Sequence, residues 1–319
     1  MPELSSSESP LMLLSGTANR ELAERIATEL EQPLCDVTIK RFADGEIFVG
    51  INENVRGRDV FIIQPTSPPA ENVLELLILV DAAKRASAAR VTAVVPYYGY
   101  ARQDRKDQPR VSIAAKLLAN LLVAAGTDRL LSIDFHQHQL QGFFDIPVDH
   151  LYAAPVFREY FEKLGLDNLV VVATDVGAAK MARGYAKRLG AGLAMVDKRR
   201  PGPNVAEILN VVGDVEGKRC LIPDDMIDTA GTICGAVQAL RERGAVEIYC
   251  AATHALLSGP AIQRLEEADV REIVITDTVA VPEEKKAALK NLTVLSVANL
   301  LARAIESTHY NRSVSSLFG

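Results

Sequence analysis

The chain has 319 residues, 48% of them hydrophobic and 24% charged, and a formal net charge of −6 at pH 7. This length and apolar content suffice for a sizeable core and predict two domains, and the acidic balance argues against bulk nucleic-acid binding. No apolar run approaches the length of a membrane span, and the four apolar residues 11–14 are too few for a signal peptide. We therefore expect a cytoplasmic protein that binds neither nucleic acid nor membrane.

The four cysteines are Cys35, Cys220, Cys234 and Cys250. They show no CxxC spacing, and three of the four sit within apolar patterns. This distribution is typical of buried, reduced thiols rather than of disulfides or a zinc site.

The first half of the chain alternates predicted strands and helices. Apolar spacing predicts strands at 11–14, 60–64, 91–95 and 130–134, and helices at 19–30, 72–86 and 113–125. Between residues 41 and 65, apolar residues flank Asp44 and Gly45, a dipeptide typical of a hairpin turn.

A basic loop follows the predicted strand 91–95. Residues 96–110, PYYGYARQDRKDQPR, carry four cations, Arg102, Arg105, Lys106 and Arg110. Such a group can neutralise a polyphosphate, although acidic neighbours offset part of the charge and a merely solvated loop is the alternative. The position favours binding, because open α/β sheets bind ligands at the carboxyl ends of their strands.

Two histidines follow the predicted strand 130–134. His136 and His138 are two residues apart, so they point to opposite sides if the backbone stays extended, and one of them can meet a ligand. The spacing does not decide which.

The alternation begins afresh in the second half. Strands are predicted at 169–173, 193–196, 219–222, 248–252 and 273–276, and helices at 156–164, 260–268 and 296–309, with another helix within 174–190. Asp175 stands at a strand end just before Gly177, where a ligand can meet its carboxylate and a helix N-terminus. Residues 197–204, DKRRPGPN, predict an exposed loop or a lid that brings positive charge onto a phosphoryl transition state.

The stretch 218–235 predicts a strand, an acidic loop and a helix that begins near Thr232. Exposed amides at the helix start favour an anion, Gly231 permits close backbone approach, and the threonine hydroxyls can donate. The acids can accept hydrogen bonds from sugar hydroxyls or hold a divalent cation. We interpret the stretch as a cradle for a phosphorylated sugar, with an ordinary strand-to-helix turn as the alternative.

Two motifs carry a resemblance to known families. DDMIDTAGT, residues 224–232, resembles the ribose-5-phosphate loop of phosphoribosyltransferases and of ribose-phosphate pyrophosphokinases, whereas YARQDRK, residues 100–106, resembles the ATP-binding loop of the pyrophosphokinases. The resemblance extends over nearly the whole chain after residue 10, including SVSSLFG at 313–319. It implies an α/β fold of two tandem phosphoribosyltransferase-like domains, each a mainly parallel sheet flanked by helices. The implied domains are an ATP-binding domain at 1–154, completed by 295–319, and a ribose-5-phosphate-binding domain at 155–294.

The resemblance also implies roles for individual residues. ATP would be bound by Phe42, Asp44, Glu46, Arg102, Gln103, Asp104 and His136, the first three reaching across a subunit interface to adenine. Ribose 5-phosphate would be bound by Asp175, Asp224, Asp225, Asp228, Thr229, Ala230, Gly231 and Thr232. His136 and Asp175 would lie at the Mg²⁺ site, and Lys198 and Arg200 would be catalytic.

The implied reaction transfers pyrophosphate from ATP to ribose 5-phosphate, with the basic and acidic loops facing each other in a cleft between the domains. Phosphate and ADP are expected effectors, through Arg56, Ser313 and Ser315, and the family's assembly is a hexamer of dimers. Pro223 and Ala178 depart from the family pattern and leave the loop backbones open. A phosphoribosyltransferase and a non-catalytic regulatory homologue are the alternatives.

Overall fold

The structure, a computed structural model, describes residues 9–199 and 208–318. The chain forms two compact units. The first runs to Ala153 and includes Thr278–Ala280 and the C-terminal segment from Ser296, and the second comprises Ala154–Asp277 and Val281–Leu295. In the described residues, no helix is long and apolar enough to cross a membrane.

The first unit is built on a five-stranded parallel sheet in the order β1-β4-β5-β6-β7, with a separate antiparallel hairpin, β2-β3. Its elements are β1 (Leu11–Ser15), α1 (Arg20–Glu29), β2 (Val37–Arg41), β3 (Ile47–Ile51), β4 (Asp59–Ile63), α2 (Glu71–Arg85), β5 (Arg90–Val95), α3 (Ala114–Ala125), β6 (Arg129–Ile133), η1 (His138–Phe143), β7 (Val148–Leu151), α9 (Ala298–His309) and η2 (Ser315–Phe318).

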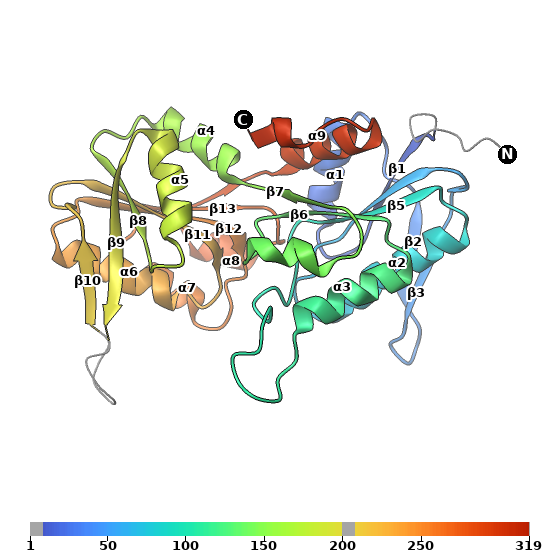
Figure 1. Cartoon of the computed structure of the whole chain (residues 1–319), viewed down its shortest axis with the longest axis horizontal. Coiled ribbons are helices and arrows are strands. Elements are labelled where there is room, and N and C mark those ends of the chain that lie inside the picture. Colours follow the sequence, from blue (N-terminus) through green and yellow to red (C-terminus); the bar gives the residue numbers. More distant parts are fainter. Residues whose placement is uncertain (1–8, 200–207, 319) are drawn as a thin grey trace. The chain divides into compact units, whose positions relative to one another are not determined.

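Helices cover both faces of this sheet (Figure 1). Helices α2 and α3 pack on one face, where Val60, Leu79 and Leu118 belong to one apolar cluster. Helices α1 and α9 pack against each other on the opposite face. Strand β4 is buried along its whole length, as expected of a central parallel strand covered on both faces.

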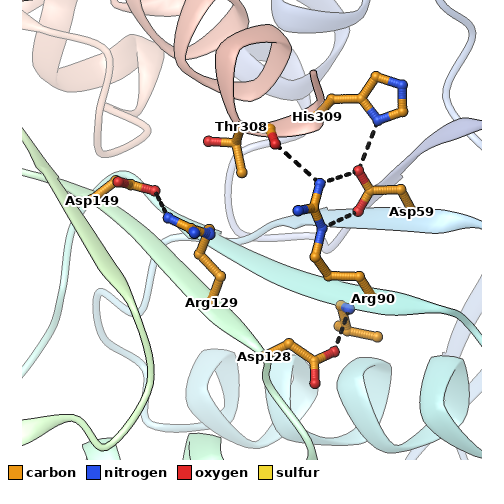
Figure 2. A network of polar contacts seen from close by, with 8 residues as sticks. Asp59, Arg90, Asp128, Arg129, Asp149, Thr308 and His309 are labelled. Atoms are coloured by element: carbon orange, nitrogen blue, oxygen red, sulfur yellow. Dashed lines mark hydrogen bonds and ion pairs between the residues drawn. The ribbon is translucent and has the colours of Figure 1, made fainter. Parts of the chain in front are cut away.

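A buried polar network ties the C-terminal helix α9 to the sheet of the first unit (Figure 2). The Asp59 carboxylate, only 1% exposed, accepts from Arg90 Nε at 2.8 Å and lies 2.7 Å from His309 Nδ1. Arg90 also donates to the carbonyl of Thr308 at 3.1 Å. A carboxylate so deeply buried needs such partners, because an unpaired charge in the interior is very costly. The C-terminal helix is thereby part of the first unit's core.

The second unit is built on a seven-stranded sheet in the order β10-β9-β8-β11-β12-β13-β14, in which only the β10-β9 pair is antiparallel. Its elements are α4 (Ala154–Leu164), β8 (Leu169–Ala173), α5 (Ala179–Leu189), β9 (Gly192–Arg199), β10 (Ile208–Val212), β11 (Arg219–Ile227), α6 (Gly231–Glu242), β12 (Glu247–Ala255), α7 (Ala261–Glu267), β13 (Glu272–Thr276), α8 (Glu283–Ala288) and β14 (Leu292–Leu295).

Helices also flank this second sheet on both faces (Figure 1). Helices α6 and α7 share an apolar cluster with the sheet through Ile233 and Leu265. Helix α4 packs Phe161 edge-on against Tyr249 of β12, with ring centroids 6.2 Å apart. The predicted α/β class, with mainly parallel sheets flanked by helices, is confirmed. The two sheets also share one strand order, since β1-β4-β5-β6-β7 corresponds to β8-β11-β12-β13-β14. In both units an antiparallel pair follows the first of these strands along the chain, β2-β3 after β1 and β9-β10 after β8.

Several predicted element boundaries were wrong. The predicted strand 193–196 extends through Arg199, because β9 pairs with β10 as far as the Arg199–Ile208 register. The start of the predicted loop 197–204 is therefore strand. Patterning also missed β7, β10 and β14, which lie at sheet edges. Short edge strands bury little apolar surface, so their sequence periodicity is weak.

Candidate functional site

The basic loop of the first unit and His136 line one cavity. The cavity, of about 320 Å³, is formed by the segment after β5 and the segment after β6, and is lined by Arg102, Gln103, Asp104, Arg105, Asp107, Gln108, Val111, Ser112, His136 and Gln137. Strands β5 and β6 are parallel neighbours, so their carboxyl ends lie at the same edge of the sheet. The structure thus brings together four residues that the sequence assigned to ATP, and the presence of Arg102 and Arg105 suits an anionic ligand. Their binding of ATP stays a prediction.

The three remaining ATP candidates lie at the tip of the β2-β3 hairpin. Gly45, at φ +96°, turns the chain, and the turn is closed by hydrogen bonds from the Phe42 amide to the Glu46 carbonyl and from the Glu46 amide to Asp44 Oδ1. The hairpin predicted from Asp44-Gly45 is therefore confirmed. The Phe42 side chain is 49% exposed, so it contributes little to the core and is available to a ligand.

Strand β11 carries two of the sugar-binding candidates. Asp224, Asp225 and Asp228 were predicted to lie in a loop after residue 222. Only Asp228 does, since β11 continues to Ile227 and β12 pairs with it as far as the Ile227–Ala255 register. On the side of β11 opposite β12, the pairing with β8 ends at Leu221. Pro223 is therefore tolerated in β11, because its missing amide proton removes no hydrogen bond between β11 and β8. Asp224 and Asp225 are thus held on a rigid strand.

The carboxyl ends of β8 and β11 gather negative charge. Burial raises the pKa of the Asp224 carboxyl, and the nearby Asp225 and Asp175 carboxylates add to the effect. Asp224 Oδ1 accepts from the Asp225 amide at 2.8 Å, while Asp175 Oδ1 accepts from the Ala178 amide in the turn before α5. The site therefore favours a ligand that donates hydrogen bonds or carries positive charge.

The segment after β11 prepares the start of α6 for an anion. Ala230, at φ +60°, holds a left-handed conformation that costs an L-residue about 1 kcal/mol, and α6 begins at Gly231. Among the described residues, no side chain caps this helix start. The first amides of a helix have no acceptor within the helix, and its dipole is positive there. Thr229, Gly231 and Thr232 thus surround a place suited to phosphate.

One residue at this place was missed by sequence reasoning. Arg264, from α7, donates through Nη1 to the carbonyl of Thr229 at 2.9 Å. A Cβ atom on Gly231 would lie 3.3 Å from the same nitrogen, so the guanidinium sits beside the start of α6. No local signal could have found Arg264, because it lies 35 residues from Thr229 and only the packing of α7 on α6 joins them.

The remaining candidates are less completely described. Lys198 lies in β9, opposite Leu209 of β10, and Arg200 lies outside the described residues. Ser313 and Ser315, after α9, are hydrogen-bonded through their hydroxyls at 2.8 Å. The Arg56 amide donates to Asn54 Oδ1 in the turn before β4. Catalytic and effector roles for these residues stay predictions.

The metal candidates His136 and Asp175 belong to different units. The part of the chain that the structure describes holds no cluster of three or more His, Cys, Asp or Glu side chains able to bind a metal. Mg²⁺ is commonly held by one or two carboxylates together with substrate phosphates, rather than by a complete protein cage. The carboxylates near Asp224 fit such an ion, because a cation would stabilise the charged form of the Asp224 carboxyl against the burial, and then the repulsion from Asp225 and Asp175, that raise its pKa.

Comparison with known proteins decides the family. Residues 11–126 match the model for the N-terminal domain of ribose phosphate pyrophosphokinase, and residues 202–319 match that for the phosphoribosyl synthetase-associated domain. A ribose-phosphate pyrophosphokinase of Chlorobaculum tepidum is 52% identical over 98% of this chain and 96% of its own length. The chain belongs to the ribose-phosphate pyrophosphokinase family. A relative of the same name from Rhodopirellula baltica is 53% identical over 97% of this chain and 98% of its own length.

The fold of a solved family member agrees. The crystal structure of phosphoribosylpyrophosphate synthetase from Mycobacterium smegmatis superposes with a TM-score of 0.89 at 46% identity. The match covers 95% of this chain and 100% of the other, so both units have their counterparts there. The resemblance to the ribose-phosphate pyrophosphokinase family is confirmed.

Proposed function

We propose that the chain transfers pyrophosphate from ATP to the anomeric hydroxyl of ribose 5-phosphate, giving 5-phosphoribosyl 1-pyrophosphate and AMP for nucleotide biosynthesis. The observation that carries the proposal is 52% identity to a ribose-phosphate pyrophosphokinase over nearly the full length of both chains. In the reaction, the anomeric oxygen loses its proton and bonds to the β-phosphorus, while the bond from that phosphorus to the α,β-bridging oxygen breaks and AMP leaves.

Ribose 5-phosphate binds at the carboxyl edge of the second unit's sheet. Asp224 and Asp225 accept hydrogen bonds from the ribose hydroxyls, which replace water as donors and so offset the desolvation that raises the Asp224 pKa. The 5-phosphate binds at the start of α6, from Asp228 to Thr232, where backbone amides and the Thr229 and Thr232 hydroxyls donate. Holding the sugar at both ends orients the anomeric hydroxyl, and such orientation supplies a large part of the rate of a two-substrate reaction.

ATP binds in the cavity of the first unit. Arg102 and Gln103 donate to the triphosphate, with Asp104 and His136 on the same cavity wall. Across a subunit interface, Phe42 on the exposed hairpin tip of one subunit stacks on the adenine bound by a neighbouring subunit, with Asp44 and Glu46 accepting hydrogen bonds.

His136 and Asp175, each from its own unit, would hold Mg²⁺ together with the substrate phosphates, and the ion would supply neutralising charge for the transferring group. Lys198 and Arg200 stabilise the charge that develops on the β-phosphoryl group, a role that contributes about a thousandfold or more to rate in related chemistry. Their neighbourhood of consecutive cations, residues 198–200, supports this assignment.

Regulation, assembly and location in the cell form part of the same proposal. Phosphate activates and ADP inhibits through Arg56, Ser313 and Ser315, the chain assembles as a hexamer of dimers, and it works in the cytoplasm. Identity of 50–52% to ribose-phosphate pyrophosphokinases over nearly the full length of both chains supports carrying over the family's regulation and assembly.

The test is incubation of the purified protein with ATP, Mg²⁺ and ribose 5-phosphate, with AMP and 5-phosphoribosyl 1-pyrophosphate measured by chromatography. AMP should form only when ribose 5-phosphate is present, and the turnover of Lys198→Ala and Arg200→Ala should fall by about a thousandfold. Absence of sugar-dependent AMP formation would overturn the proposed function, whereas normal turnover in both variants would remove only the two cations from the mechanism.

A further inference from the structure

Thr66 joins the segments that follow β4 and β5 in the first unit. The Thr66 amide donates to the Tyr97 carbonyl oxygen at 2.9 Å, and the Thr66 hydroxyl donates to the same oxygen at 3.2 Å. The hydroxyl oxygen in turn accepts from the Gly99 amide at 2.7 Å. Thr66 is 1% exposed, so these hydrogen bonds are made away from water. One side chain therefore satisfies two backbone groups of the neighbouring segment.

Gly99 allows this contact because it has no side chain. A Cβ atom at this position would lie 2.1 Å from the Thr66 carbonyl oxygen, far inside van der Waals contact. The two segments are thus pressed together backbone to backbone. Because the Gly99 amide is buried, it depends on the Thr66 hydroxyl as its acceptor.

The chain beyond Gly99 is fixed by further hydrogen bonds until it reaches the cavity. Tyr100 holds a left-handed conformation at φ +61°, and its carbonyl accepts from the Gln103 amide at 2.9 Å. The Gln103 carbonyl accepts from the Ala115 amide at the start of α3, at 3.2 Å. Gly99 is therefore the entry to a closed turn whose later residues, Arg102 and Gln103, line the cavity.

We propose that Thr66 is a positioning residue for nucleotide binding, which sets the direction of the 99–103 turn and so aims Arg102 and Gln103 into the cavity. Thr66 does not line the cavity, and it acts through the Gly99 amide. The inference rests on the proposed binding of ATP in this cavity. It adds to that function a residue from another segment of the chain, 36 positions before Arg102, that determines the geometry of the triphosphate site.

The test compares two variants at Thr66 with a matched control. Thr66→Val keeps the shape of the side chain but leaves the Gly99 amide without its acceptor, whereas Thr66→Ser keeps the hydroxyl. The control is Thr92→Val in β5, because Thr92 is fully buried and its hydroxyl has no hydrogen-bond partner among the described residues. Each protein is measured for the KM of ATP, the KM of ribose 5-phosphate, and hydrogen–deuterium exchange of the 97–106 peptide.

Thr66→Val should raise the KM of ATP about tenfold, equivalent to about 1.4 kcal/mol, and leave the KM of ribose 5-phosphate within about twofold of the wild type. Hydrogen–deuterium exchange of the 97–106 peptide should be faster in Thr66→Val than in the wild type. Thr66→Ser should bring the KM of ATP and the exchange rate back to within about threefold of the wild type, and Thr92→Val should change neither quantity. An equal rise of both KM values, unchanged exchange, or no rescue by serine would overturn the role of Thr66. If the wild type itself forms no sugar-dependent AMP, the proposed function fails first.

Discussion

The acidic pair on β11 gives a quantitative prediction about stability. Asp224→Asn should stabilise the ligand-free protein at neutral and alkaline pH, because the asparagine side chain has nearly the same shape and does not ionise. The pKa of Asp224 is raised by burial and then by Asp225, so the folded protein keeps the proton at pH values where the unfolded chain has released it. The wild type therefore loses stability as pH rises above the unfolded pKa of about 3.9, until the raised folded pKa is passed.

The size of the effect follows from proton linkage. Across that window, one carboxyl group changes the free energy of unfolding by about 1.4 kcal/mol for each pH unit. The advantage of Asp224→Asn should thus grow steadily between pH 5 and 7. For a unit of this size, each 1 kcal/mol corresponds to about 2–4 °C in Tm, so the gain in Tm should grow by about 3–5 °C per pH unit.

Thermal unfolding followed by circular dichroism, without Mg²⁺ or substrates, measures this gain. The control is Asp214→Asn in the same unit, because Lys218 lowers the pKa of that exposed carboxyl and its removal should give no gain that grows with pH. Asp224→Asn should also lose most of its activity. A Tm difference that stays constant or shrinks from pH 5 to 7 would refute the assignment of an uncompensated buried carboxyl to Asp224.

Three further changes test other parts of the structure. Arg90→Met leaves the buried Asp59 carboxylate without its main partner and should lower the free energy of unfolding, measured by urea denaturation, by about 3–5 kcal/mol. The control Arg85→Met removes an exposed ion pair and should cost less than about 0.5 kcal/mol. Equal losses in the two variants would contradict the buried network. Arg264→Gln should raise the KM of ribose 5-phosphate more than that of ATP in steady-state assays, because the guanidinium holds the Thr229 carbonyl, and an unchanged KM would separate it from the site. Phe42→Ala should leave Tm within about 2 °C of the wild-type value, because the ring is half-exposed. It should raise the KM of ATP at least fivefold, as expected for the loss of about 1 kcal/mol of base stacking. An unchanged KM of ATP would count against a contact between Phe42 and adenine.

The strong elements and the basic loop could be predicted from the sequence. Strand β4 contains the apolar run Val60–Ile63, and the Asp44-Gly45 turn is local, so neighbouring residues suffice to specify both. The end of β11 could not be predicted in the same way. Pro223 and the following acids read locally as a loop, yet pairing with β12 on one side alone keeps them in the strand. A strand end is decided by its neighbours in the sheet, which lie far away in the sequence.

The sequence by itself determined the α/β class, the alternation of strands and helices, and the motifs that name the family, because each depends on residue type and local spacing. Only the tertiary structure decided which distant groups share a site. It joins Thr66 to Gly99, Arg264 to Thr229, and His309 to Asp59, pairs separated by 33, 35 and 250 positions. Such contacts depend on how sheets and helices pack, and packing brings together residues that carry no common signal along the chain.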